Sequence, residues 1–195
     1  MIVIDLHLGI LFILYLAIVC VTLVIHKLKR KNKYNIYGLI LFELYILCLV
    51  KVVYTPVRIV FDRSINGEML ERMKMNYVNF IPFKTIMGVE SIHNFIVQVG
   101  GNIILLMPLV FFMYYIFFVK SYRKCAIYGF STIIFIEITQ YIIDIITKFP
   151  NKVCDVDDVI LNFGGITLSI LIIHLLKNIK LEKGIINFLT NNETR

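Results

Sequence analysis

Long apolar runs separated by short polar segments form the main pattern of the sequence. Each of five runs has about the 20 residues, or a few more, that a helix needs to cross the hydrocarbon core of a bilayer. They cover residues 2–25, 36–54, 95–119, 125–147 and 156–176. No spacer between them is rich enough in Pro, Gly or Ser to serve as a domain linker. The pattern predicts an all-α fold, a polytopic membrane helix bundle of about five transmembrane helices, with residues 1–195 as a single integral membrane domain.

Composition agrees with a membrane location. Hydrophobic residues make up 59% of the chain and charged residues only 17%, which is outside the range of ordinary soluble domains. The N-terminal run has no basic residue before Lys27 and is too long for the apolar part of a secretory signal peptide. We therefore expect it to stay attached as the first span. The four cysteines do not have the spacing of a disulfide framework.

Positive charge is concentrated in three blocks that follow the first, third and fifth runs. The blocks lie within residues 27–33, 120–124 and 177–183, and the net charge is +7. Cytoplasmic loops of membrane proteins carry the excess of Lys and Arg, so these blocks are topology signals and contacts to anionic lipid. They predict an N-terminus outside, a cytoplasmic C-terminus with residues 181–195 as a tail, and no nucleic-acid partner.

Three carboxylates and an asparagine stand at the start of the fifth run. With about 100° per residue, Asp155, Asp158 and Asn162 fall on one face of a helix, whereas Asp157 points elsewhere. Ionisable side chains at or inside a bilayer are costly, so their retention makes a functional site the default hypothesis. The aligned polar groups therefore predict a surface that faces a ligand or another part of the bundle.

Three further segments place polar side chains toward the same outer side. Asn79 lies in the long connection 55–94, which could form a lid. Gln98 and Asn102 share a face of the third run. Glu137, Gln140 and Asp144 share a face of the fourth, and Lys152 follows in the next loop. Amides and small residues are also typical of contacts between membrane helices, and a polar network that only fixes helix register would place the same residues. One shared outward-facing pocket is the more economical interpretation.

Two carboxylates lie inside predicted membrane spans and need a polar or charged partner there. Glu137 has to be protonated, paired with a cation or placed in a water-filled cleft, and Lys152, Arg58 and Arg63 are the candidate cations. Glu43 in the second run has no obvious companion and is left unassigned. The stretch 79–83 places two aromatic residues around Pro82, which suits an interfacial or re-entrant segment as well as a packed loop.

Four of these motifs, in this order, resemble the VanZ-like family over a core of about residues 76–169. They are Asn79-Phe80-Ile81-Pro82-Phe83, the run from Asn102 to Pro108, the run from Glu137 to Gln140, and Asp155-Val156-Asp157-Asp158 followed by Asn162 and Gly165. Two positions depart from the family pattern: Lys152 replaces an arginine and Val110 replaces a glycine. The resemblance implies a bacterial, multi-pass protein of the cell membrane whose family namesake accompanies glycopeptide resistance and lowers susceptibility to teicoplanin.

Three functions remain open. The first is an envelope factor, not an enzyme, that binds a membrane lipid, a lipid-linked cell-wall precursor or a lipoglycopeptide antibiotic in the polar pocket. Its ligand-binding residues would be Asn79, Asn102, Glu137, Gln140, Asp144, Lys152, Asp155, Asp158 and Asn162. The second is a membrane enzyme that modifies such a lipid by carboxylate acid–base or metal-assisted chemistry. The third is a structural assembly partner. The sequence shows no nucleophile–base pair, metal-ligand spacing or phosphate loop, so we expect no metal and no cofactor.

Overall fold

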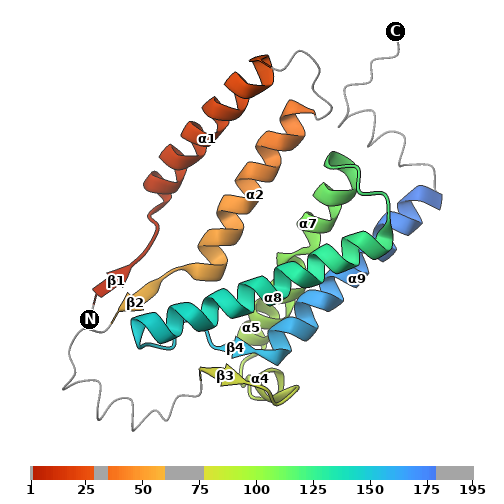
Figure 1. The fold of residues 1–195 in the computed structure, drawn as a ribbon. Helices are drawn as coiled ribbons and strands as arrows, with labels where there is room; N and C mark the ends of the chain where they lie inside the picture. The colour runs from red at the N-terminus through yellow and green to blue at the C-terminus, as the bar shows by residue number, and fades with distance from the viewer. Residues whose placement is uncertain (1, 29–34, 60–76, 179–195) are drawn as a thin grey trace.

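The structure is a computed structural model that describes residues 2–28, 35–59 and 77–178. Five helical spans in these ranges are long and apolar enough to cross a membrane, and they run side by side in Figure 1. They are α1 (Leu8–Leu28), α2 (Ile36–Tyr54), a broken third span (Ile92–Ile116), α8 (Tyr122–Thr147) and α9 (Val156–Asn178). The predicted all-α membrane bundle is confirmed, whereas its orientation stays a prediction. The predicted tail 181–195 lies outside the described residues.

The first span is shorter than the apolar run suggested. Residues Ile2–Ile4 form strand β1, which pairs antiparallel with β2 (Val57–Ile59). The prediction of a helix from residue 2 was therefore wrong, because an apolar run does not reveal that its first residues find a strand partner 55 residues away. Helix α1 contacts α2, and Lys51 of α2 donates from Nζ to the Leu6 carbonyl over 2.9 Å. The first two spans thus form a hairpin fastened at its strand end.

The third span is a chain of short helical pieces. In order they are α5 (Ile92–Phe95), the π-helix η1 (Ile96–Gly100), α6 (Gly101–Leu105), α7 (Met107–Phe111) and the π-helix η2 (Phe112–Ile116). The break falls at Leu106, whose φ and ψ of −102° and 0° are not helical. Pro108, which cannot donate a backbone hydrogen bond, follows two residues later. The span is thus interrupted beside Pro108, and it begins and ends three residues earlier than the predicted range 95–119.

The core lies where the third span, α8 and α9 pack together. Leu106, Ile133, Ile166 and Ile173 are fully or almost fully buried there. A Cβ on Gly165 of α9 would lie only 1.9 Å from the Ile103 carbonyl oxygen of α6. The backbones of these two helices therefore touch at a point where no side chain fits, as small residues allow in membrane bundles.

A second pair of strands holds the loop before the third span against the start of α9. Strand β3 (Val78–Asn79) pairs parallel with β4 (Cys154–Asp155), with Val78 opposite Cys154 and Asn79 opposite Asp155. The short helix α4 (Lys84–Met87) follows β3. Figure 1 shows β3, α4 and β4 together at one end of the bundle. Asp155 therefore precedes α9, so it does not share a helix face with Asp158 and Asn162 as predicted.

Candidate functional site

Asp157 holds the segment around α4 in place. Its side chain is 1% exposed and accepts hydrogen bonds from three backbone N–H groups, those of Phe83, Thr85 (2.9 Å) and Ile86 (3.1 Å). A carboxylate at the start of a helix satisfies N–H groups that have no partner inside the helix. Asp157, which the sequence placed away from the predicted polar face, thus anchors the segment around α4 to the start of α9.

Asp155 and Asn79 join β4 to the same loop through their side chains. Asn79 Nδ2 donates to Asp155 Oδ1 (3.0 Å) and to Thr85 Oγ1 (2.9 Å), and the Thr85 hydroxyl donates to Asp155 Oδ2. The backbone N–H of Asp157 also donates to Asp155 Oδ1 (2.9 Å). Both oxygens of Asp155 therefore have protein donors.

Among the described residues, the partners of the buried Glu137 carboxylate are hydrogen-bond donors and not cations. Its Oε2 accepts from the backbone N–H of Asp155 over 3.1 Å, and the Cys154 thiol is also hydrogen-bonded to it. Of the candidate cations, Arg58 lies over the Phe149 ring at 5.6 Å, and Arg63 lies outside the described residues. Burial, together with the negative charge and hydrogen bond of Glu137, raises the pKa of Cys154 to about 11. Cys154 is therefore a thiol at neutral pH.

Asp158, Asn102 and Asn162 connect α9 to the third span. Asn102 Nδ2 donates to Asp158 Oδ1, and Asn162 Nδ2 donates to the Asp158 carbonyl over 2.8 Å. Among the described residues, the buried Oδ1 of Asn162 has no hydrogen-bond partner. The predicted closeness of these three residues is present: the Asn102–Asp158 bond joins the third span to α9, whereas the Asn162–Asp158 bond lies within α9.

Gln140 and Asp144 on α8 bind backbone groups. Gln140 Nε2 donates to the Val53 carbonyl at the end of α2 (3.0 Å). Asp144 Oδ1 accepts from the N–H groups of Asn151 (2.9 Å) and Lys152 (3.4 Å), which shapes the loop after α8. Asp144 is fully buried and supports this loop.

An open cavity of about 770 Å³ lies at this end of the bundle. Five of the nine predicted ligand-binding residues line it: Asn79, Gln140, Lys152, Asp155 and Asp158. The other four, Asn102, Glu137, Asp144 and Asn162, lie behind its wall. The prediction missed Lys84, Thr85 and Asn151, which also line it. Lys84 and Thr85 directly follow the motif 79–83, so their position next to this motif could have identified them as lining residues.

The sequence matches the family model of VanZ/LLP1 over residues 42–177, more than two thirds of the chain. The chain belongs to the VanZ/LLP1 family. No curated protein and no solved structure gives a significant match. The family match begins within α2 and ends near the end of α9, so the region shared with other VanZ/LLP1 proteins contains the cavity and the described residues that support it.

In this VanZ/LLP1 protein the cavity holds charges of both signs. Lys84 and Lys152 line it, and neither ammonium group makes a hydrogen bond or a close ion pair with another described residue. Across residues 2–28, 35–59 and 77–178, no three His, Cys, Asp or Glu side chains are grouped so that they could hold a metal ion. The chemistry that the cavity offers to a ligand is therefore cationic and amide recognition beside two carboxylates, Asp155 and Asp158.

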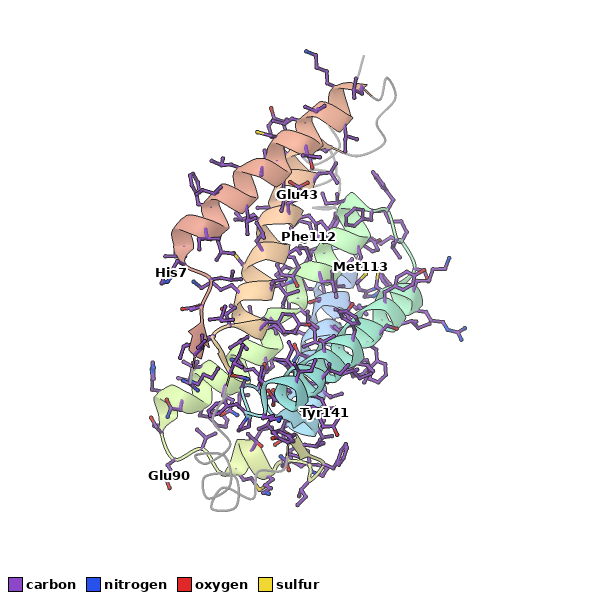
Figure 2. The ribbon with its side chains drawn as sticks, turned by 60° about the vertical axis from the view of Figure 1, so that its left-hand side comes forward. His7, Glu43, Glu90, Phe112, Met113 and Tyr141 are labelled. Atoms are coloured by element: carbon purple, nitrogen blue, oxygen red, sulfur yellow. The ribbon has the colours of Figure 1, made fainter. Side chains whose placement is uncertain are left out.

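Glu43 is separate from this site. Thr22 of α1 donates to its Oε1, and its Oε2 is buried without a partner among the described residues. Figure 2 shows Glu43 beside α1 and α2, toward the opposite end of the bundle from Glu90, which precedes the third span. Its contact identifies Glu43 as a link between the first two helices.

Proposed function

We propose that this VanZ/LLP1 protein binds the head group of an envelope amphiphile in the cavity and thereby lowers susceptibility to teicoplanin-type glycopeptides. The observation that carries the proposal is the cavity of about 770 Å³, which is lined by polar groups and lies at one end of a membrane bundle. Ligand sites are concave and use a few well-placed polar groups to fix orientation. The ligand would be a membrane lipid, a lipid-linked cell-wall precursor or a lipoglycopeptide.

The apolar residues at the rim of the cavity favour an amphiphilic ligand rather than a fully polar one. Phe80 and Ile81 line the cavity and are nevertheless 79% and 59% exposed. Aromatic and aliphatic side chains at a membrane surface pack against lipid chains. A ligand with its head group in the cavity and its tail against these residues satisfies both kinds of surface.

A membrane enzyme acting on such a lipid is the second candidate. Asp158 lines the cavity and uses only one carboxylate oxygen, Oδ1, in its hydrogen bond with Asn102. The other oxygen is available to accept a proton from a ligand, as a general base does. The first candidate is preferred because the remaining carboxylates of this end, Asp155, Glu137 and Asp144, accept hydrogen bonds from the protein's own groups.

The test is teicoplanin susceptibility of a sensitive host that expresses the protein or its Asp158→Asn and Asn162→Ala variants at matched membrane levels. We expect protection from the unchanged chain, and a loss of at least fourfold in the inhibitory concentration for Asp158→Asn. Asp5→Asn is the matched control, because Asp5 is an exposed carboxylate outside the cavity. Absence of protection by the unchanged chain, or full protection by both variants, would contradict the proposal.

A further inference from the structure

Two lysines from different segments face the same cavity, and buried carboxylates fix the backbone of each. Lys84 is the first residue of α4, the helix that Asp157 caps through Phe83, Thr85 and Ile86. The backbone N–H of Lys152 donates to Asp144 Oδ1. The two cations are therefore held at defined places in the wall, although their side chains have no close partner among the residues that the structure describes.

The carboxylates in the wall are occupied to different degrees. Asp155 accepts hydrogen bonds on both oxygens from Asn79, Thr85 and its own loop. Asp158 has one oxygen left and interacts electrostatically with Lys152. Gln98, which lines the cavity from η1, has no hydrogen-bond partner among the described residues. Among the described residues, the groups that remain for a ligand include two ammonium groups, the Gln98 amide and one oxygen of Asp158.

From this arrangement we infer that the ligand is a lipid whose head group carries a phosphate, held between Lys84 and Lys152. This inference rests on the proposed binding function and names the chemistry of its ligand. Phosphate oxygens accept charge-assisted hydrogen bonds from ammonium groups, which are about twice as strong as neutral ones. The remaining oxygen of Asp158 would accept from a hydroxyl or amine elsewhere on the head group. The exposed Phe80 and Ile81 at the rim distinguish a lipid phosphate from a free phosphate ion.

The experiment compares two lipids that differ only in the phosphate, phosphatidic acid and diacylglycerol with the same acyl chains. Binding to the purified full-length protein in detergent is measured by native mass spectrometry or by thermophoresis. We expect the protein to bind phosphatidic acid at least tenfold more tightly. Each of Lys84→Gln and Lys152→Gln should weaken phosphatidic acid binding about tenfold, which corresponds to loss of one charge-assisted contact, and leave diacylglycerol binding unchanged.

A lysine that the cavity does not use provides the control. Lys148 is exposed after α8, lies outside the cavity, and has a positive φ of 53° that asparagine tolerates. Lys148→Asn should bind phosphatidic acid as the unchanged protein does. An equal loss in this variant would show that general surface charge attracts the lipid, and it would overturn the site.

The outcomes separate this inference from the function on which it rests. Equal binding of both lipids would keep an amphiphile site and overturn its phosphate chemistry. Binding of neither lipid would overturn the phosphate inference, while the teicoplanin assay independently tests the function. Competition by millimolar inorganic phosphate as effective as that by phosphatidic acid would assign the site to the free ion and overturn a lipid ligand.

Discussion

At the scale of single residues, the acidic side chains at the cavity end of the bundle have different structural roles. Asp157, Asp155 and Glu137 are buried and accept hydrogen bonds from the protein itself. Asp155 and Asp158 both line the cavity, and Asp158 keeps one carboxylate oxygen without a hydrogen bond among the described residues. Helical spacing in the sequence singled out Asp155 and Asp158 and set Asp157 apart. The structure assigns Asp157 the largest number of backbone contacts among them, because it caps a helix that lies more than 70 residues earlier in the chain.

Replacement of Asp157 should damage the fold more than the cavity variants do. Asp157→Ala removes the acceptor of three backbone N–H groups, each worth about 1 kcal/mol or more when left unsatisfied, so we expect a loss of about 3 kcal/mol. The measurement is the temperature at which half of the detergent-extracted protein leaves the monodisperse gel-filtration peak. Asp5→Ala, at an exposed position of the same end, should not move it. A midpoint unchanged in Asp157→Ala would contradict the capping role.

Cys154 provides a pH-dependent signal of the Glu137 contact. Its thiol has a pKa raised to about 11, and only the thiolate reacts with alkylating reagents. In a variant with the other three cysteines replaced by serine, alkylation at pH 8 should be far slower in the folded protein than in dodecyl sulfate. The rate should rise with pH up to about 11.

Glu137→Gln tests the cause of this shift. Removal of the negative charge lowers the pKa of the thiol, so alkylation at pH 8 should become severalfold faster than in the parent. Asp5→Asn serves as the charge-loss control and should leave the rate unchanged. A rate in Glu137→Gln equal to that of the parent would show that burial alone slows the reaction.

At the scale of elements, hydrophobic runs predicted the spans well and their irregularities poorly. The second span has the predicted bounds Ile36–Tyr54, and the fourth and fifth differ by three residues or fewer at either end. In the third span, α6 and α7 pack against α9 and the π-helix η2 packs against α2, and no local sequence pattern records such contacts. Strands of two or three residues escape sequence reasoning for a similar reason, since β3 is defined only by its pairing with β4.

Two adjacent glycines of α9 provide a sharp test of the helix contact. In Gly165→Ala the new Cβ would meet the Ile103 carbonyl oxygen at 1.9 Å, so α6 and α9 have to separate. We expect a severalfold loss of folded protein in the membrane. Gly164→Ala meets nothing within 4 Å and should be tolerated, because alanine favours a helix over glycine by about 1 kcal/mol. Equal amounts of both variants, measured by fluorescence-detected gel filtration, would contradict the close packing.

At the scale of the whole molecule, the cavity and the basic residues around the start of α8 lie at opposite ends of that helix, and therefore on opposite sides of the membrane if α8 spans it. The loop after α8 borders the cavity, whereas Lys120, Arg123 and Lys124 lie at the other end of α8. The positive-inside rule then predicts that the cavity lies outside the cell. The part of the chain shared with the family, residues 42–177, includes α8 and α9 but not α1. The third span, α8 and α9 carry residues of the cavity wall, so the orientation of these three spans decides on which side of the membrane the cavity opens.

Single cysteines at the two ends of α8 would test this orientation. Lys148→Cys and Lys124→Cys are both exposed positions, and each is made in a chain whose four native cysteines are replaced by serine. A membrane-impermeant maleimide should label Lys148→Cys in intact cells and Lys124→Cys only after the membrane is permeabilised. The reverse pattern would place the cavity in the cytoplasm and contradict access to an extracellular antibiotic.

The bond between Asn79 and Asp155 also limits how early the loop before the third span can reach its final structure during synthesis. The two residues are 76 positions apart, and the third and fourth spans lie between them. Until the ribosome has made the start of the last span, the N–H groups of Phe83, Thr85 and Ile86 lack the acceptor that Asp157 provides. A nascent chain with four spans would thus expose an unfastened loop to membrane proteases. Synthesis of β4 and the start of α9 would supply the acceptors that fasten this loop, and the same residues would complete the wall of the cavity.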